Sequence, residues 1–170
     1  SKRYISQIDR SEEMPQRVWD FVARGLFSVN NQWIPGYTFR HRRKIEELIA
    51  DLGLESVRYK QYAELSEGVK QRVRLAQALV CKSELIVLDE PSSAMDPQQT
   101  QKYYAYLSKY IRENEASSLV ISHHFRDLMD YFTHALVFDE DAYYISTIDE
   151  LKRNASLCRK FRLGESCDGE

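Results

Sequence analysis

The feature of this sequence that most constrains its fold is the apolar run Leu85-Ile86-Val87-Leu88, which is followed directly by Asp89, Glu90 and Pro91. Four consecutive aliphatic residues are typical of a short strand that is buried on both faces, as in a parallel sheet covered by helices. In such sheets ligands bind beyond the carboxyl ends of the strands. The two carboxylates therefore stand where a ligand or a metal ion is expected, although solvated acids at a strand end are a common alternative.

The residues around this strand predict a parallel α/β sheet. Asp96 and Pro97 form a good helix start, with Asp as the cap and Pro in the first turn, and the helix should reach about Asn114. We expect further buried strands at 119–121, 135–138 and 143–145, and a short helix at 125–132. Residues 81–151 thus alternate strand and helix in the manner of a parallel sheet.

The first half of the chain is predicted to be mainly helical. After a short strand at 2–5, the apolar spacing predicts a helix through 18–26, a loop at 28–36 and an amphipathic helix that ends near Gly53. Ser66 then stands at the N-cap of a further helix. Residues 8–80 are therefore predicted to be mainly helical and to precede the main part of the sheet.

Composition bounds the class of protein. With 170 residues and 43% apolar residues, the chain is one modest domain or part of one, with enough apolar surface for a core. Its net charge of −2 gives no general attraction to nucleic acid or membranes, and no apolar run is long enough to span a bilayer. Three widely spaced cysteines, without metal-ligand spacing, favour reduced thiols in the cytosol.

A second motif precedes the buried strand and reads Leu65-Ser66-Glu67-Gly68-Val69-Lys70-Gln71-Arg72. A serine hydroxyl and a glycine N–H at the start of a helix form an anion site, because the peptide dipoles favour negative charge there. Glycine also lets a ligand approach the backbone closely. An ordinary serine-capped helix is the alternative for this motif taken alone.

These motifs, in this order and followed by Ser93-Ala94-Met95-Asp96 and Ser122-His123, resemble the C-terminal half of the ATP-binding-cassette (ABC) ATPase. The resemblance covers about residues 3–151. It implies an α/β fold, a P-loop NTPase-like parallel sheet that is incomplete, with an inserted helical subdomain. We expect a partial nucleotide-binding domain at 1–158, with the helical subdomain at about 8–80 and the α/β core at about 81–151. Residues 159–170 would be a flexible tail.

The resemblance also implies catalytic and metal-binding roles. Glu90 would orient or deprotonate the attacking water, and His123 would donate a hydrogen bond to the γ-phosphate. Asp89 would hold Mg²⁺ through water, and Gln7 would approach the same Mg²⁺ and the water. A strand-end histidine and a surface glutamine without a role are the alternatives for His123 and Gln7. His124 stands beside His123, but the position of His123, 34 residues after Asp89, is the one that matches.

Three further residues would contact the nucleotide, ATP. Ser66 and Gly68 are expected to touch the γ-phosphate, and Asp96 belongs to the loop that follows the acidic strand. The motif departs from its commonest form at Glu67, where glycine is usual, and at Val69, where glutamine is usual. Glu67 places a negative charge near a triphosphate, which the helix dipole offsets only in part.

The 170 residues contain no Gly-x-x-x-x-Gly-Lys-Ser/Thr phosphate loop. The resemblance therefore implies that this polypeptide is part of a longer gene product, and that alone it is marginally stable and inactive as an ATPase. A split cassette completed by another chain is the alternative. The segment with the phosphate loop would also supply a strand between the one ending at His123 and the one at 135–138, whose backbones would otherwise lie unpaired.

The function implied is the ATP-binding and hydrolysing subunit of an ABC transporter at the cytoplasmic face of a membrane. Its partners would be a second cassette, identical or different, and transmembrane subunits, and the helical segment has some resemblance to metal or iron-chelate uptake systems. Two alternatives remain: a soluble ABC ATPase acting on nucleic acid or ribosomes, and a non-catalytic truncated cassette. Only the basic run at 40–44 favours nucleic acid, which is not an expected partner.

Overall fold

The structure is a computed structural model that describes residues 2–5, 15–27, 37–123, 128–139 and 142–154. They form two compact units, residues 1–122 and residues 123–170. Gln7, the whole loop expected at 28–36 and the tail at 159–170 lie outside the described residues.

The first unit contains a parallel sheet of three strands in the order β1-β2-β3. These strands are β1 (Lys2–Ile5), β2 (Leu85–Asp89) and β3 (Ser117–Ile121). The register places Ile5 beside Leu88, and Asp89 beside Ile121. The predicted parallel α/β arrangement is confirmed for these strands, and their carboxyl ends meet at one edge of the sheet.

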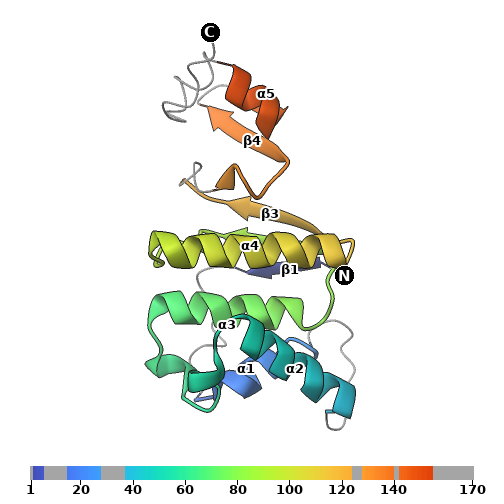
Figure 1. The fold of residues 1–170 in the computed structure, drawn as a ribbon, viewed down its shortest axis with the longest axis vertical. Helices are drawn as coiled ribbons and strands as arrows, with labels where there is room; N and C mark the ends of the chain where they lie inside the picture. The colour runs from blue at the N-terminus through green and yellow to red at the C-terminus, as the bar shows by residue number, and fades with distance from the viewer. Residues whose placement is uncertain (1, 6–14, 28–36, 124–127, 140–141, 155–170) are drawn as a thin grey trace. The chain divides into compact units, whose positions relative to one another are not determined.

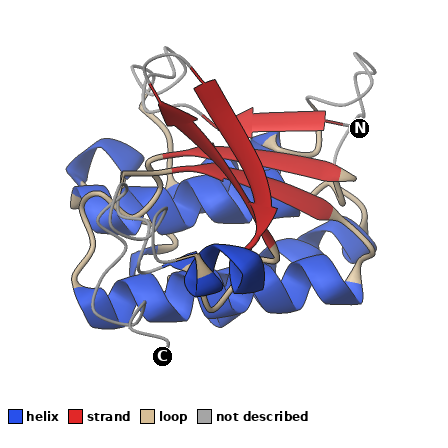
Figure 2. Ribbon diagram, turned by 90° about the horizontal axis from the view of Figure 1, so that it is seen from above, coloured by secondary structure: helices blue, strands red, loops and turns tan. Residues whose placement is uncertain are grey.

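Four helices accompany this sheet and follow the predicted pattern closely. They are α1 (Val18–Arg24), α2 (Phe39–Asp51), α3 (Glu67–Leu79) and α4 (Pro97–Glu113), with short 3₁₀ turns η2 (Glu55–Val57) and η3 (Tyr62–Glu64). Figure 1 shows α4 running along the sheet and α1, α2 and α3 grouped together. The long helices lie to one side of the strands (Figure 2).

The core of the first unit is built around α3. Its buried apolar residues are Val73, Leu75, Ala76, Ala78 and Leu79. Helix α1 packs closely on it, because a Cβ added at Gly25 would lie 2.2 Å from the carbonyl oxygen of Gln77. Tyr110 of α4 donates a hydrogen bond to the Leu79 carbonyl at 2.8 Å, in a buried position. The helix that carries the 65–72 motif is therefore held from two sides.

Strand β3 differs from its prediction as a buried strand. The side chains of Leu119 and Ile121 are 48% and 47% exposed, whereas Ile86 and Leu88 on the neighbouring β2 are fully buried. Among the described residues β3 pairs only with β2, so it is an edge strand. An apolar sequence predicts a strand but cannot show whether anything covers it.

The second unit corrects the prediction of parallel strands beyond His123. Strands β4 (His134–Asp139) and β5 (Ala142–Thr147) pair antiparallel and are followed by helix α5 (Ile148–Arg153). Two residues connect these strands, and such a short connection cannot make the crossover that parallel strands need. Of the helix expected at 125–132, residues 128–131 form a turn and 124–127 lie outside the described residues.

The hairpin also has an apolar face that the prediction of buried strands did not anticipate. Leu136 pairs with Ile145 and Phe138 with Tyr143, so these four side chains share one face. Their exposed fractions run from 44% to 74%. Helix α5 buries Ile148 and Leu151, and Ala135 of β4 is buried as well. The second unit thus has a small core and one uncovered apolar face.

Candidate functional site

The first part of the candidate site is the start of α3. Ser66 occupies the N-cap with extended backbone angles, as predicted, but its side chain makes no capping hydrogen bond. The first intrahelical bond of this turn runs from the Lys70 N–H to the Ser66 carbonyl at 2.9 Å. The Ser66 hydroxyl is therefore not consumed by capping, and an anion at this helix start could accept from it and from the backbone.

Gly68 has a packing role that sequence reasoning missed. It is buried, and a Cβ at this position would lie 2.9 Å from the carbonyl oxygen of Ala94. The side chains of Met95 and Gln99 follow at 3.7 and 3.4 Å. Glycine here therefore allows the first turn of α3 to touch the loop between β2 and α4, which brings the two predicted motifs together.

Asp96 caps α4, as its sequence position predicts. Its carboxylate accepts a hydrogen bond from the Gln99 N–H at 2.8 Å, and Pro97 opens the helix. The same loop is fixed by a buried hydrogen bond of 2.9 Å between the hydroxyls of Ser92 and Tyr104. The loop between β2 and α4 is thus anchored independently of any ligand.

Asp89 and Glu90 stand at the carboxyl end of β2. The Glu90 N–H donates to the Ile121 carbonyl at 2.9 Å, and its carboxylate accepts from the Ser122 hydroxyl at 3.5 Å. Glu90 has a φ of +45°, in the left-handed region that disfavours side chains. Such conformations cost on the order of 1–3 kcal/mol and cluster at functional sites. The backbone therefore turns at the residue predicted to be catalytic.

The donor set suits a Mg²⁺ ion held jointly with a phosphate. The described residues contain no group of three or more histidine, cysteine or acidic side chains placed to bind a metal. Mg²⁺ commonly takes one or two carboxylates and completes its coordination with water and substrate phosphates. Asp89 offers such a carboxylate at the strand end, so the residues fit the predicted ion.

The described structure does not test the remaining predicted residues. His123 belongs to the second unit, and Gln7 lies outside the described residues. The structure therefore brings together Gly68 with the loop before Asp96, and Glu90 with Ser122. The roles of His123 and Gln7 remain predictions.

An ion pair in the first two turns of α3 was not predicted. The Arg74 guanidinium lies 2.7 Å from the Glu67 carboxylate, and the Lys70 ammonium lies 3.9 Å from the same group. The Arg74 side chain is only 5% exposed. A spacing of seven residues places Glu67 and Arg74 on one face of a helix, so the sequence did contain a signal for this pair.

The basic run at 40–44 is partly engaged within the unit. The His41 N–H and the Thr38 hydroxyl form a capping box, Arg43 pairs with Glu47 at 2.9 Å, and Lys44 lies over the ring of Tyr110. Hydrogen bonding through Thr38 and His41 explains how a basic segment can open a helix. The run is therefore a weaker basis for nucleic-acid binding than its sequence implied.

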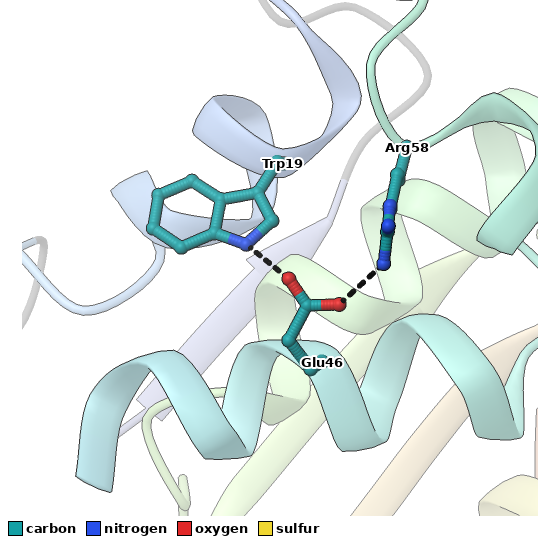
Figure 3. A network of polar contacts seen from close by, with 3 residues as sticks. All are labelled: Trp19, Glu46 and Arg58. Carbon is teal, nitrogen blue, oxygen red and sulfur yellow. Dashed lines mark hydrogen bonds and ion pairs between the residues drawn. The ribbon is translucent and has the colours of Figure 1, made fainter. Parts of the chain in front are cut away.

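A polar network joins α1, α2 and the segment after η2. Glu46 of α2 accepts from the Trp19 indole N–H at 2.9 Å and from Arg58 at 3.2 Å (Figure 3). Trp19 lies on α1, and Arg58 follows η2. One carboxylate thus ties together three segments that are separate in the sequence.

Comparisons with known proteins agree with these motifs. The profile of the family described as "ABC transporter" matches residues 4–93. The chain is 39% identical over 84 residues to the lipoprotein-releasing system ATP-binding protein LolD of Hyphomonas neptunium, covering 49% of this chain and 37% of the relative. It is 32% identical over 122 residues to the ABC transporter ATP-binding protein YmeB of Lactococcus lactis, covering 71% and 47%.

Solved structures show the same fold. An ABC transporter of metal-chelate type, in an inward-facing conformation, matches with a TM-score of 0.78 at 18% identity, covering 94% of this chain and 62% of that one. The chain belongs to the ABC transporter family, on the evidence of the profile that matches more than half of it. It spans less than half the length of the two curated relatives. None of the described helices is long and apolar enough to cross a membrane.

Proposed function

We propose that this chain is the part of an ATP-binding cassette that carries the signature helix and the catalytic acid, and that the complete cassette hydrolyses ATP to drive transport. The observation that carries the proposal is the contact of the Gly68 turn with the Ala94 carbonyl, next to the strand end of Asp89 and Glu90. An anion-binding helix start and a pair of strand-end carboxylates are what phosphoryl transfer to water requires.

In this proposal Glu90 is the general base. Its backbone turn and its bond from Ser122 hold the carboxylate at the end of β2. From there it would accept a proton from the attacking water or orient that water. Asp89 would hold Mg²⁺, which would balance the charge of the phosphates. His123 and Gln7 would add hydrogen bonds to the γ-phosphate and the water.

The start of α3 is proposed to bind the γ-phosphate of a nucleotide held mainly by a second cassette. Ser66 and the N–H groups of the first turn supply donors, and the helix dipole favours the negative charge. The phosphate loop is absent from these 170 residues, so another segment or another chain must supply it. ATP would therefore lie between two cassettes, identical or different.

The partners proposed are transmembrane subunits at the cytoplasmic face of a membrane. Support comes from the relatives, one of which is the ATP-binding protein of a lipoprotein-releasing system. The metal-chelate type of the matching solved transporter supports metal or iron-chelate uptake as the substrate class to test first.

The experiment is an ATP hydrolysis assay on the full-length protein with Mg²⁺. We expect Glu90→Gln to lower kcat by at least about a hundredfold while ATP binding is retained, because the amide fills the same space but cannot accept the proton. Glu84→Gln, at the residue directly before the opposite end of the same strand, is the control and should hydrolyse ATP normally. Equal activity of Glu90→Gln and wild type would refute the assigned base, and a wild type that hydrolyses no ATP would favour the non-catalytic reading.

A further inference from the structure

We propose that Arg74 is a positioning residue that neutralises Glu67, and thereby lets a helix start that carries a carboxylate accept a phosphate. This inference rests on the proposed function of the α3 start. It concerns two residues, Glu67 and Arg74, which the structure brings together as an ion pair.

Glu67 creates an electrostatic conflict at this position. As the first residue of α3 it is favoured by the helix dipole, and its side chain is 47% exposed. The same dipole is what should attract a phosphate to Ser66 and Gly68. A carboxylate and a phosphate at one helix start repel each other, and an exposed carboxylate in the first turn would weaken phosphate binding.

Arg74 resolves this conflict from inside the unit. Its guanidinium lies 2.7 Å from the Glu67 carboxylate, while 95% of its side chain is removed from solvent. Because a guanidinium stays charged, burying it without a close partner is costly, and the Glu67 carboxylate supplies that partner. Solvent ions hardly reach the buried Arg74 guanidinium, so salt weakens the attraction between Arg74 and Glu67 only in part. The attraction should therefore persist at physiological salt.

Two neighbouring groups bear on the charge of Arg74. On α4, burial raises the pKa of Tyr103, and the charge of Arg74 acts against that rise. Lys70 is a weaker partner of Glu67, at 3.9 Å, and its ammonium also lies 5.8 Å from the centre of the Tyr62 ring. Arg74 is therefore the principal counter-charge, and Lys70 adds to it.

The test uses ATP hydrolysis and ATP-dependent dimerisation of the full-length protein. Arg74→Met removes the charge but keeps much of the side-chain volume, and we expect it to lower kcat/KM for ATP by about tenfold or more. Glu67→Gln combined with Arg74→Met should recover kcat/KM to within about threefold of wild type, because no uncompensated carboxylate remains. Arg74→Lys should be affected least of the Arg74 variants.

Two controls separate charge from folding. Lys109→Met removes an exposed ion-pair partner on α4 and should leave kcat/KM unchanged. The thermal midpoint of each variant shows whether it is folded. Rescue by Glu67→Gln is the decisive readout, since it restores charge balance without refilling any space left by the arginine.

Each outcome is informative. Wild-type activity in Arg74→Met overturns the inference, as does an equal defect with and without Glu67→Gln, which would mean that Arg74 acts only in packing. If Glu90→Gln abolishes hydrolysis while Arg74→Met does not affect it, the proposed function stands and this inference fails. If wild type hydrolyses no ATP, the proposed function itself fails, and dimerisation with ATP then tests the role of Arg74 in binding.

Discussion

Strands β2 and β3 lie side by side in one sheet, yet their aliphatic side chains are buried to different extents on its two faces. Ile86 and Leu88 of β2 are fully buried, whereas Leu119 and Ile121 of β3 are nearly half exposed. Both sequences are aliphatic, so their hydrophobicity does not explain the difference. The difference lies in the face of the sheet. The register pairs Leu119 with Val87 and Ile121 with Asp89, so Leu119 and Ile121 lie on the face opposite to Ile86 and Leu88. They also lie on a strand that pairs only with β2 among the described residues.

The hairpin β4–β5 resembles β3 in this respect. Leu136, Phe138, Tyr143 and Ile145 form an apolar face that no described element of the second unit covers. Exposed apolar faces and open strand edges usually mark surfaces that another segment or chain completes. Our expectation that the segment with the phosphate loop supplies a strand beside β3 remains a prediction.

The largest expected effect is a loss of stability that differs between the two strands. Leu88→Ala should lower the free energy of unfolding by about 2 to 5 kcal/mol, because it leaves a cavity in a buried position. Leu119→Ala should cost less than about 1.5 kcal/mol in the 170-residue chain, because its side chain is already half in water. Urea denaturation of both variants measures the two values.

The same pair of variants in the full-length protein sharpens the comparison. If a further segment covers β3, the cost of Leu119→Ala should rise toward that of Leu88→Ala, to about 2 kcal/mol or more. An unchanged small cost would mean that this face of β3 stays exposed in the complete protein.

At the contact between α1 and α3, Gly25→Ala should lower the free energy of unfolding by about 1 to 3 kcal/mol. The added methyl group would lie 2.2 Å from the Gln77 carbonyl oxygen, so α1 must move away from α3. Thermal denaturation followed by circular dichroism measures the change. A variant as stable as wild type would show that α1 is not packed this closely.

A smaller loss of stability is expected when polar contacts between the helices of the first unit are removed. Glu46→Ala removes the acceptor for Trp19 and Arg58, and should cost about 1 kcal/mol in unfolding free energy. Glu47→Ala, which removes only the exposed partner of Arg43, should cost about 0.3 kcal/mol. Equal values for the two variants would contradict a role for the Glu46 network in holding α1, α2 and Arg58 together.

The smallest effect concerns alkaline pH. Burial raises the pKa of Tyr110 to about 12, above its usual value of 10.0. Because the folded state favours the neutral phenol, the stabilisation is complete below pH 10 and is lost as pH rises through about 12. Thermal midpoints measured from pH 8 to pH 11 should fall above pH 10, and a Tyr110→Phe variant should show a weaker fall.

Local sequence patterns were sufficient where a residue acts through its own segment. Asp96 and Pro97 predict the start of α4, the run at 85–88 predicts β2, and Ser66 marks the start of α3. These features depend on capping, apolar spacing and the fixed φ of proline. They could be predicted because each is determined within a few residues.

Features that depend on distant neighbours could not be predicted in this way. The positive φ of Glu90, the contact of Gly68 with Ala94 and the exposure of Leu119 all depend on what lies next to the residue in space. The antiparallel hairpin was not predicted, because the strands at 135–138 and 143–145 were interpreted as parts of a parallel sheet. The connection at residues 140–141 is too short for parallel strands, and this was overlooked. The spacing of Glu67 and Arg74 was visible, but only the structure showed that the arginine is buried.

The central claim is that the start of α3 in one cassette meets ATP bound by another, and ATP-dependent dimerisation tests it most directly. Sedimentation of full-length Glu90→Gln with ATP and Mg²⁺ should show a dimer, because binding without hydrolysis holds the two cassettes together. Adding Ser66→Arg should leave a monomer that still binds ATP, since a bulky cation replaces the hydroxyl at the helix start. Dimers that persist with Ser66→Arg, or ATP-bound Glu90→Gln that stays monomeric, would contradict this account.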